Sequence, residues 1–268
     1  MEGKNIALEQ RFDEDREERL PALAADLVRL RVDVIVAAAT PAVKAAQQAT
    51  TTIPIIIVHT ADPVGLGFVA SFALPGGNIT GLSSLSPELS GKRLELLKEA
   101  VPKLARIAVL WNAANPGTRI AFQELQDAAR VLKLRVQSLE VRQIEDLAPA
   151  VKAVTGQRPV GLVTLLDPLV VSQRARIVEL AAGKRLPAMY PTKDFVEAGG
   201  LMAYGPDLVD SYRRAAIFMD KILKGAKPAN LPVEHPTKFN FAINLKTAKA
   251  LGIRFPPSIM VRADQMIE

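Results

Sequence analysis

The chain has 268 residues, of which 49% are hydrophobic, so it can bury a sizeable core as one large domain or as two lobes. It has no cysteine, which excludes disulfides, thiol nucleophiles and cysteine-based zinc or iron–sulfur sites. Only two histidines are present, His59 and His235, so we expect no multi-histidine metal site and no cofactor.

The net charge of +6 does not by itself predict a nucleic-acid partner. Residues 1–20 carry four basic and seven acidic side chains, whereas residues 213–268 carry ten basic and four acidic ones. The basic residues fall singly along helical stretches, and aromatic residues make up only 5% of the chain. This pattern favours a solvated basic face over a platform on which bases stack.

Neither a membrane span nor a secretion signal is evident from the hydrophobic pattern. No stretch approaches the ~18 uninterrupted apolar residues that a spanning helix needs, and residues 1–6 contain no apolar signal region. The protein is therefore expected either to be cytoplasmic or to have a signal that this chain lacks.

The first part of the chain alternates short apolar runs with stretches of helical periodicity, which is typical of a parallel α/β fold. Leu20, Leu23 and Leu27 recur at helical spacing, for example. The pattern predicts helices over 20–30, 40–48 and 87–101 and strands over 32–38, 55–58 and 79–82.

After about residue 104 the same alternation restarts. It predicts strands over 106–111, 135–140, 160–166, 187–190 and 201–204 and helices over 116–132, 144–154, 170–183, 193–198 and 208–223. The proline-rich segment from residue 227 is different and is predicted to hold a strand over 239–243 and a helix over 244–251.

Four strands end in a short polar residue followed by proline, a pair that favours the start of a helix. In a parallel sheet these strand ends lie at the carboxyl edge, where open α/β folds bind ligands. Each helix start would also offer free N–H groups to an anion such as a carboxylate. The four pairs are Thr40-Pro41, Asp62-Pro63, Asn115-Pro116 and Asp167-Pro168.

Motifs of common enzyme classes are missing. The chain contains no phosphate-binding loop, no dinucleotide fingerprint and no serine-hydrolase elbow. His59 follows a buried run and has Asp62 near it, but general base catalysis also needs a positioned nucleophile that the sequence does not identify. We therefore expect a protein that is not an enzyme, with an unknown reaction at His59, Asp62 or Asp167 as the alternative.

Seven segments in a fixed order resemble the family of ABC-transporter substrate-binding proteins related to the tryptophan-type binders. They are HTADPVG at 59–65, PGGNITGLS at 75–83, ELSGKRLELLK at 88–98, WNAANP at 111–116, AGGLMAYGP at 198–206, LPVE at 231–234 and NLKTA at 244–248. The likeness runs over nearly the whole chain.

The resemblance implies a type I periplasmic-binding-protein fold, with two Rossmann-like lobes joined by a three-stranded hinge. It implies lobe one at residues 1–104 plus 205–232 and lobe two at residues 105–204 plus 233–268. It also implies that the signal and the first strand and helix of lobe one precede this chain, in which case the full-length protein is periplasmic or a membrane-anchored lipoprotein. An exposed edge of the lobe-one sheet would then favour a homodimer.

The implied function is to bind a small solute in the cleft, an aromatic or branched amino acid or a related carboxylate, and to deliver it to a membrane permease. The candidate ligand-binding residues are Thr40, Ala42, Thr60, Asp62 and Thr80 on lobe one, and Trp111, Asn112, Asn115, Asp167, Tyr190, Asp194 and Tyr204 on lobe two or the hinge. Two alternatives of the same fold are a sugar or nucleoside binder and the effector-binding domain of a transcription regulator.

Overall fold

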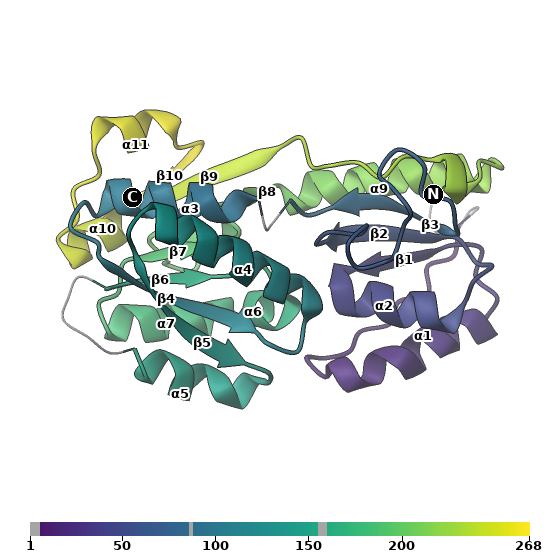
Figure 1. Cartoon of the computed structure of the whole chain (residues 1–268), viewed down its shortest axis with the longest axis horizontal. Coiled ribbons are helices and arrows are strands. Elements are labelled where there is room, and N and C mark those ends of the chain that lie inside the picture. The colour runs from purple at the N-terminus through teal and green to yellow at the C-terminus, as the bar shows by residue number, and fades with distance from the viewer. Residues whose placement is uncertain (1–5, 86–87, 155–159) are drawn as a thin grey trace.

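The computed structural model describes residues 6–85, 88–154 and 160–268, and it forms two lobes that lie side by side, each built on its own sheet (Figure 1). The smaller sheet has three strands in the order β1-β2-β3, and the larger has seven in the order β10-β9-β8-β7-β6-β4-β5. The parallel α/β class predicted from the hydrophobic pattern is confirmed.

Lobe one is a parallel sheet covered by helices on both faces. Its strands are β1 (Ile35–Ala38), β2 (Ile55–Thr60) and β3 (Ile79–Ser83). Its helices are α1 (Leu20–Arg29), α2 (Ala39–Ala49) and α9 (Leu208–Leu223), with the short 3-10 helices η1 (Glu17–Arg19) and η3 (Pro228–Asn230).

Both faces of β2 are buried, which explains why its sequence is a continuous apolar run rather than an alternating one. Ile55 and Ile57 pack with residues of α1 and α2, whereas Ile56 and Val58 pack with residues of α9 on the opposite face. All four side chains have no exposed surface.

Lobe two has a similar layered arrangement around a larger sheet. Its strands are β4 (Arg106–Asn112), β5 (Arg135–Val141), β6 (Val160–Thr164), β7 (Ala188–Tyr190), β8 (Met202–Pro206), β9 (Phe239–Asn244) and β10 (Gln265–Ile267). Its helices are α3 (Leu89–Ala100), α4 (Pro116–Val131), α5 (Leu147–Lys152), α6 (Pro168–Ser172), α7 (Arg174–Gly183), α8 (Asp194–Glu197), α10 (Leu245–Leu251) and α11 (Pro257–Arg262), with η2 (Ile144–Asp146) before α5.

The pairing of these strands is parallel from β4 to β8, and β9 runs antiparallel to β8. The helix expected over 170–183 is instead two helices, α6 and α7, with Gln173 between them. The sequence patterns did not predict α11 or β10. The expected start of α3 at residue 87 lies outside the described residues.

Helix α3 belongs with lobe two, although it directly follows the last strand of lobe one. Its residues Leu94 and Leu97 pack in one core with Ile107 of β4, and the helix contacts α4, β7 and β8. The boundary expected at residue 104 would place this helix in lobe one. A periodic apolar face predicts that a helix is covered, but it does not specify which sheet covers it.

The chain passes between the lobes three times: from β3 to α3, from β8 to α9, and from η3 to β9. The passages are joined by backbone hydrogen bonds. Glu234 N donates to Gly81 O at 2.9 Å, and Asp207 N donates to Lys238 O at 3.0 Å. These three passages form the hinge that the family resemblance implies. No helix among the described residues is long and apolar enough to span a bilayer.

Gly81 in β3 allows a close approach between β2 and β3. Its φ is +132°, and an added Cβ would lie 2.3 Å from Ile57 O. We predict that Gly81→Ala lowers the free energy of unfolding by roughly 2–4 kcal/mol, because the residue must adopt a strained φ and the strands must separate. Urea denaturation followed by circular dichroism measures this change.

Gly183→Ala is the matched control, because nothing lies within 4 Å of an added Cβ at the end of α7. We expect this variant to differ from the original protein by less than about 1 kcal/mol. Equal effects of the two substitutions would contradict the role given to Gly81.

Candidate functional site

The two lobes contact each other directly at the carboxyl edges of their sheets. Thr40 in the first turn of α2 follows β1, and Gly117 in the first turn of α4 follows β4. A Cβ added to Gly117 would lie 2.5 Å from Thr40 Oγ1 and 3.1 Å from the Cβ of Ala61. The structure is therefore in a closed arrangement, with the strand ends of the two lobes facing each other.

Three of the expected polar residues meet in one hydrogen-bonded group at the edge of lobe two. Asn115 Nδ2 donates to Asp167 Oδ2 at 2.8 Å, and Asn112 Nδ2 lies 3.3 Å from both carboxylate oxygens of Asp167. All three side chains are buried. Asn112, Asn115 and Asp167 thus converge at this edge, and their role in ligand binding stays a prediction.

Two of these residues also begin helices, as the residue-plus-proline pattern predicts. Asn115 Oδ1 accepts from Gly117 N at 2.8 Å at the start of α4, and Asp167 Oδ1 accepts from Leu169 N at 3.0 Å at the start of α6. The same side chains therefore stabilise helix starts and form the polar edge.

Asp167 is a buried carboxyl group that pairs with no basic side chain among the described residues. Its hydrogen-bond donors are all amides, from two asparagines and the α6 backbone. Burial raises the pKa of Asp167 above its ordinary value, and the hydrogen bonds from Asn115 and Asn112 oppose that shift. A positive group at this edge would favour the ionised form of Asp167.

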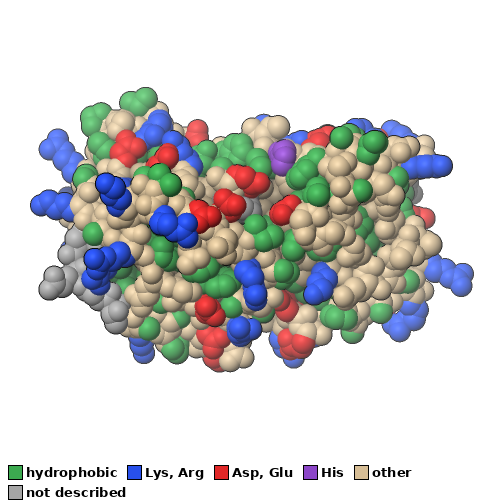
Figure 2. All heavy atoms as spheres, in the orientation of Figure 1, with side chains coloured by type: hydrophobic (Ala, Val, Ile, Leu, Met, Phe, Trp, Pro, Cys, Tyr) green, Lys and Arg blue, Asp and Glu red, His purple; other side chains and the backbone are tan. Residues whose placement is uncertain are grey.

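A second carboxylate reaches the same place from lobe one. Glu17 in η1 accepts a hydrogen bond at Oε1 from Asn112 Nδ2 at 2.8 Å, and nearby Asp15 accepts one from Gln173 Nε2 at 3.4 Å. Burial, followed by the charge of Asp167, raises the pKa of Glu17 to about 7. On the face shown in Figure 2, acidic side chains lie near the middle of the molecule and also along its lower edge.

Sequence reasoning missed Glu17, since it treated the acidic residues at positions 1–20 only as a contribution to net charge. The local signal was a run of five acidic residues over 13–18 directly before a helix. Nothing in that run indicates that Glu17 contacts Asn112 of the other lobe, because this contact depends on how the lobes close.

Three buried hydroxyls have no hydrogen-bond partner among the described residues. Thr60 ends β2, Thr164 ends β6, and Thr192 lies two residues after β7. A buried polar group without a partner costs about 1–3 kcal/mol, so such groups favour an additional ligand or water. Thr60 was among the expected residues, whereas Thr164 and Thr192 were not.

The local structure at two other expected positions differs from the prediction. Helix α2 begins at Ala39 with Ala38 as its cap, so Thr40 lies inside the first turn rather than capping it. Asp62 does not begin a helix, because its Oδ1 accepts from Gly65 N at 2.8 Å and closes a turn. The carboxylate of Asp62 is thus occupied locally.

Three expected ligand residues instead pack within a lobe. Thr80 lies near the start of β3, away from the carboxyl edge, and its Oγ1 donates to Leu231 O at 2.6 Å. Trp111 stacks on Phe122 and donates through Nε1 to Ser138 Oγ at 2.8 Å. Tyr190 is 1% exposed and stacks on Phe195, so its burial raises the pKa of its hydroxyl.

Three expected residues take part in neither the polar edge nor its hydrogen bonds. Ala42 in α2 is half-buried and packs on the core of lobe one. Tyr204 lies on β8 beside the hinge, where its ring packs edge-on against Phe241 with centroids 6.1 Å apart. Tyr204 therefore packs beside the hinge, which was one of the two places expected for it. Asp194 is half-buried and starts α8.

His59 is poorly suited to act as a catalytic base. It is buried below the start of α9, with its ring edge-on to Tyr212 at 5.6 Å between centroids. Burial lowers the pKa of His59 to about 4, so the ring is neutral near pH 7 and only weakly basic. Among the described residues, no group of three or more acidic or histidine side chains is placed to hold a metal ion.

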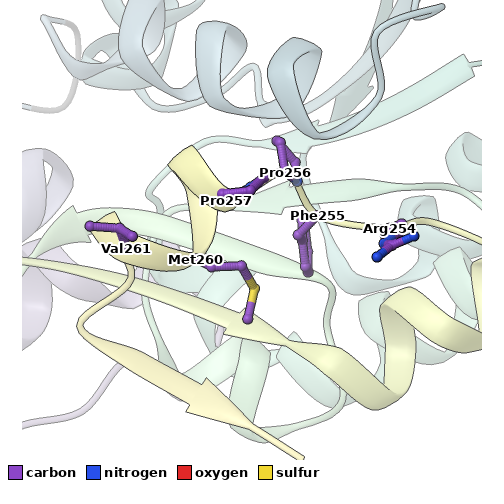
Figure 3. A pocket seen from close by; sticks show the side chains of 6 residues that line it. All are labelled: Arg254, Phe255, Pro256, Pro257, Met260 and Val261. Carbon is purple, nitrogen blue, oxygen red and sulfur yellow. The ribbon is translucent and has the colours of Figure 1, made fainter.

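A hollow of about 510 Å³ lies elsewhere, beside α11 at the end of lobe two that is farthest from lobe one (Figures 1 and 3). Its lining is apolar except for one guanidinium group. The residues are Arg254, Phe255, Pro256, Pro257, Met260 and Val261. Its position separates it from the strand ends that converge between the lobes.

Two α/β lobes, joined by three passages of the chain and closed on a polar edge, define a solute-binding protein of the type I periplasmic-binding-protein fold. The chain belongs to the ABC transporter substrate binding protein family, whose sequence pattern matches residues 1–267. This is a family of solute-binding proteins and not of enzymes.

Relatives include a tyrosine-binding protein of Clostridioides difficile (strain R20291), which is 29% identical over 254 residues, or 94% of this chain and 72% of the relative. A crystal structure of an ABC domain from Streptococcus pneumoniae in complex with L-Trp is 27% identical and has a TM-score of 0.90, covering 98% of this chain and 90% of that one.

The ligand-free, open structure of a substrate-binding protein from Clostridium difficile is 25% identical but has a TM-score of only 0.69, with 100% of this chain and 89% of that one covered. Identity to the two structures is similar, whereas the TM-score is higher for the L-Trp complex than for the open form. This chain resembles the L-Trp complex more closely than the open form, in agreement with its direct contacts between lobes.

Proposed function

We propose that this protein is the extracytoplasmic solute-binding component of an ABC importer and binds an aromatic or branched amino acid, or a related carboxylate, in the cleft between its lobes. It works in the periplasm or as a membrane-anchored lipoprotein, and it delivers the solute to a membrane permease. The binding of tyrosine by one relative and of L-Trp by another supports this choice of ligand.

The observation that carries the proposal is the buried carboxylate of Asp167, which lacks a cation at the edge where the lobes meet. An amino acid supplies an ammonium group for this edge. Its carboxylate would be bound by hydroxyl and backbone N–H groups of lobe one. The proposed ligand-binding residues are Thr40, Ala42, Thr60 and Asp62 on lobe one and Asn112, Asn115, Asp167 and Asp194 on lobe two.

Binding is coupled to hinge closure. A solute that touches both lobes only in the closed form stabilises that form by the difference between its affinities for the two states. The three passages between the lobes allow the lobes to rotate while each keeps its own core. No bond is made or broken.

We predict that L-tyrosine or L-tryptophan raises the melting temperature. A ligand at a concentration of 100 times its Kd adds about 2.7 kcal/mol to the free energy of unfolding. For a chain of this size, that corresponds to a rise in melting temperature of roughly 5–10 °C. Differential scanning fluorimetry with all amino acids, small carboxylates, sugars and nucleosides measures this effect. A screen in which only sugars or nucleosides raise the melting temperature would replace the amino-acid proposal with that alternative.

Gly117 offers a test of closure that leaves the polar groups unchanged. Gly117→Ala places a Cβ 2.5 Å from Thr40 Oγ1 and 3.1 Å from the Cβ of Ala61 across the lobes, whereas its contact within lobe two, with Asn115 Oδ1, is at 3.2 Å. We predict that it weakens the binding of the amino acid identified by the screen roughly tenfold, equal to about 1.4 kcal/mol. Isothermal titration calorimetry measures the affinity, and the melting temperature without ligand should not fall.

Gly91→Ala in α3 is the control for that substitution, because an added Cβ there makes an ordinary 3.6 Å contact with Ala128 in the same lobe. This variant should bind with unchanged affinity. If both variants bind as tightly as the original protein, closure does not bring α2 and α4 together in the bound state.

We also propose a homodimer through the outer edge of β1, which pairs with no strand among the described residues. Val36 on this strand is 45% exposed, and an unpaired strand edge is a template for a second strand. We predict that light scattering gives twice the mass of one chain and that Val36→Lys gives a monomer. Val131→Lys, on an exposed part of α4, should remain dimeric; a monomer at high concentration without substitution would exclude the dimer.

A further inference from the structure

We infer that Glu17, carried by the N-terminal segment of lobe one, forms the ion pair with the α-ammonium group of the bound amino acid, while Asp167 holds Asn112 and Asn115 in place beneath it. This inference rests on the proposed amino-acid function and names the residue that recognises the ammonium group. It refines the proposed function, in which the ammonium group lies at the edge formed by Asp167.

The hydrogen bonds of the two carboxylates distinguish their roles. Asp167 is 2% exposed and already accepts hydrogen bonds from Leu169 N, Asn115 Nδ2 and Asn112 Nδ2. Glu17 is half-buried, and among the described residues it accepts one hydrogen bond, at Oε1. Its second oxygen therefore retains its capacity to accept from an ammonium group.

The position of Glu17 couples this ion pair to closure. It precedes α1, which packs on α2 in lobe one, yet its carboxylate bonds to Asn112 at the end of β4 in lobe two. The neighbouring contact between Asp15 and Gln173 crosses between the lobes in the same way. A cation beside Glu17 would therefore be enclosed from both sides only in the closed form.

The surroundings of Glu17 are acidic, which favours a cation at this point. The charges that act on it are Asp167 at the start of α6, and Asp13 and Glu18 in its own segment. The arginines of the segment, Arg16 and Arg19, pair with Glu14 instead. An ammonium group would thus be the positive partner that the described residues do not provide.

A dependence of binding on pH follows from this arrangement. Burial and Asp167 raise the pKa of Glu17 to about 7 in the closed form, so that form takes up a proton at Glu17 as the pH falls through this range. An ammonium group beside Glu17 favours the ionised carboxylate and therefore competes with that proton. Affinity for the ammonium ligand is therefore expected to rise as the pH increases from 6 to 8.

The first experiment compares ligands with and without the ammonium group. Isothermal titration calorimetry measures the binding of L-tyrosine and of 3-(4-hydroxyphenyl)propionate, which lacks only the amino group, to the original protein, Glu17→Gln and Glu9→Gln. Gln at position 17 keeps an acceptor for Asn112 and removes the charge. We expect Glu17→Gln to weaken the binding of L-tyrosine at least tenfold and to leave that of the propionate unchanged or improved. Glu9→Gln is the control, because Glu9 is exposed and pairs with Arg11, and this variant should bind both ligands as before.

The second experiment measures protons. Titrations of L-tyrosine at pH 7 in buffers of different ionisation enthalpy should show proton release on binding in the original protein and none in Glu17→Gln. Circular dichroism and the melting temperature verify that each variant is folded. If Glu17→Gln does not fold, Glu17→Asp, which retracts the charge by one methylene, should show the same selective loss of L-tyrosine.

The outcomes separate this inference from the proposed function. If the original protein and Glu17→Gln bind L-tyrosine equally tightly and neither releases a proton, the role of Glu17 is overturned and amino-acid binding stays intact. Equal weakening of both ligands reduces Glu17 to a contact between the lobes and also overturns the inference. If L-tryptophan binds and L-tyrosine does not, the same comparison uses L-tryptophan and 3-(indol-3-yl)propionate. Failure of every amino acid to bind the original protein overturns both proposals.

Discussion

Negative charge enclosed where the two lobes meet is the constraint on which the working of this protein depends. Closing the cleft removes water from Asp167 and Glu17, and a carboxylate that loses water needs a cation, a proton or strong hydrogen bonds. Amides supply the hydrogen bonds to Asp167, and a proton can neutralise Glu17. In the proposed function the ammonium group of the ligand supplies that cation, so the cost of closing without a ligand would become a source of selectivity for cations.

The polar edge of lobe two is built by residues that each make more than one type of contact. Asn115 begins α4 and binds Asp167, Asp167 begins α6, and Asn112 connects both to Glu17 of the other lobe. The helix starts, the site and the contact between lobes therefore share their hydrogen bonds. Such a network keeps its geometry because each member is fixed by the backbone of its own element.

The elements and one half of the site could be predicted from the sequence, because their signals are local. Apolar runs such as residues 55–58 indicate buried strands, and Asn115-Pro116 and Asp167-Pro168 mark helix starts at strand ends. What failed depends on contacts between distant segments. The pairing of α3 with lobe two, the position of Thr80 beside Leu231 and the reach of Glu17 to Asn112 depend on how the lobes assemble, which no short window of sequence encodes.

The late position of α9 in the chain affects how the protein folds. Lobe one begins with the first described residues, yet one face of its sheet is covered only by α9, from residues 208–223, so that lobe is assembled from segments far apart in the chain. A chain that emerges from the ribosome in order cannot bury Ile56, Val58 and Leu82 until most of it has been made. During synthesis these side chains therefore remain an exposed apolar surface, which makes the incomplete chain prone to aggregation.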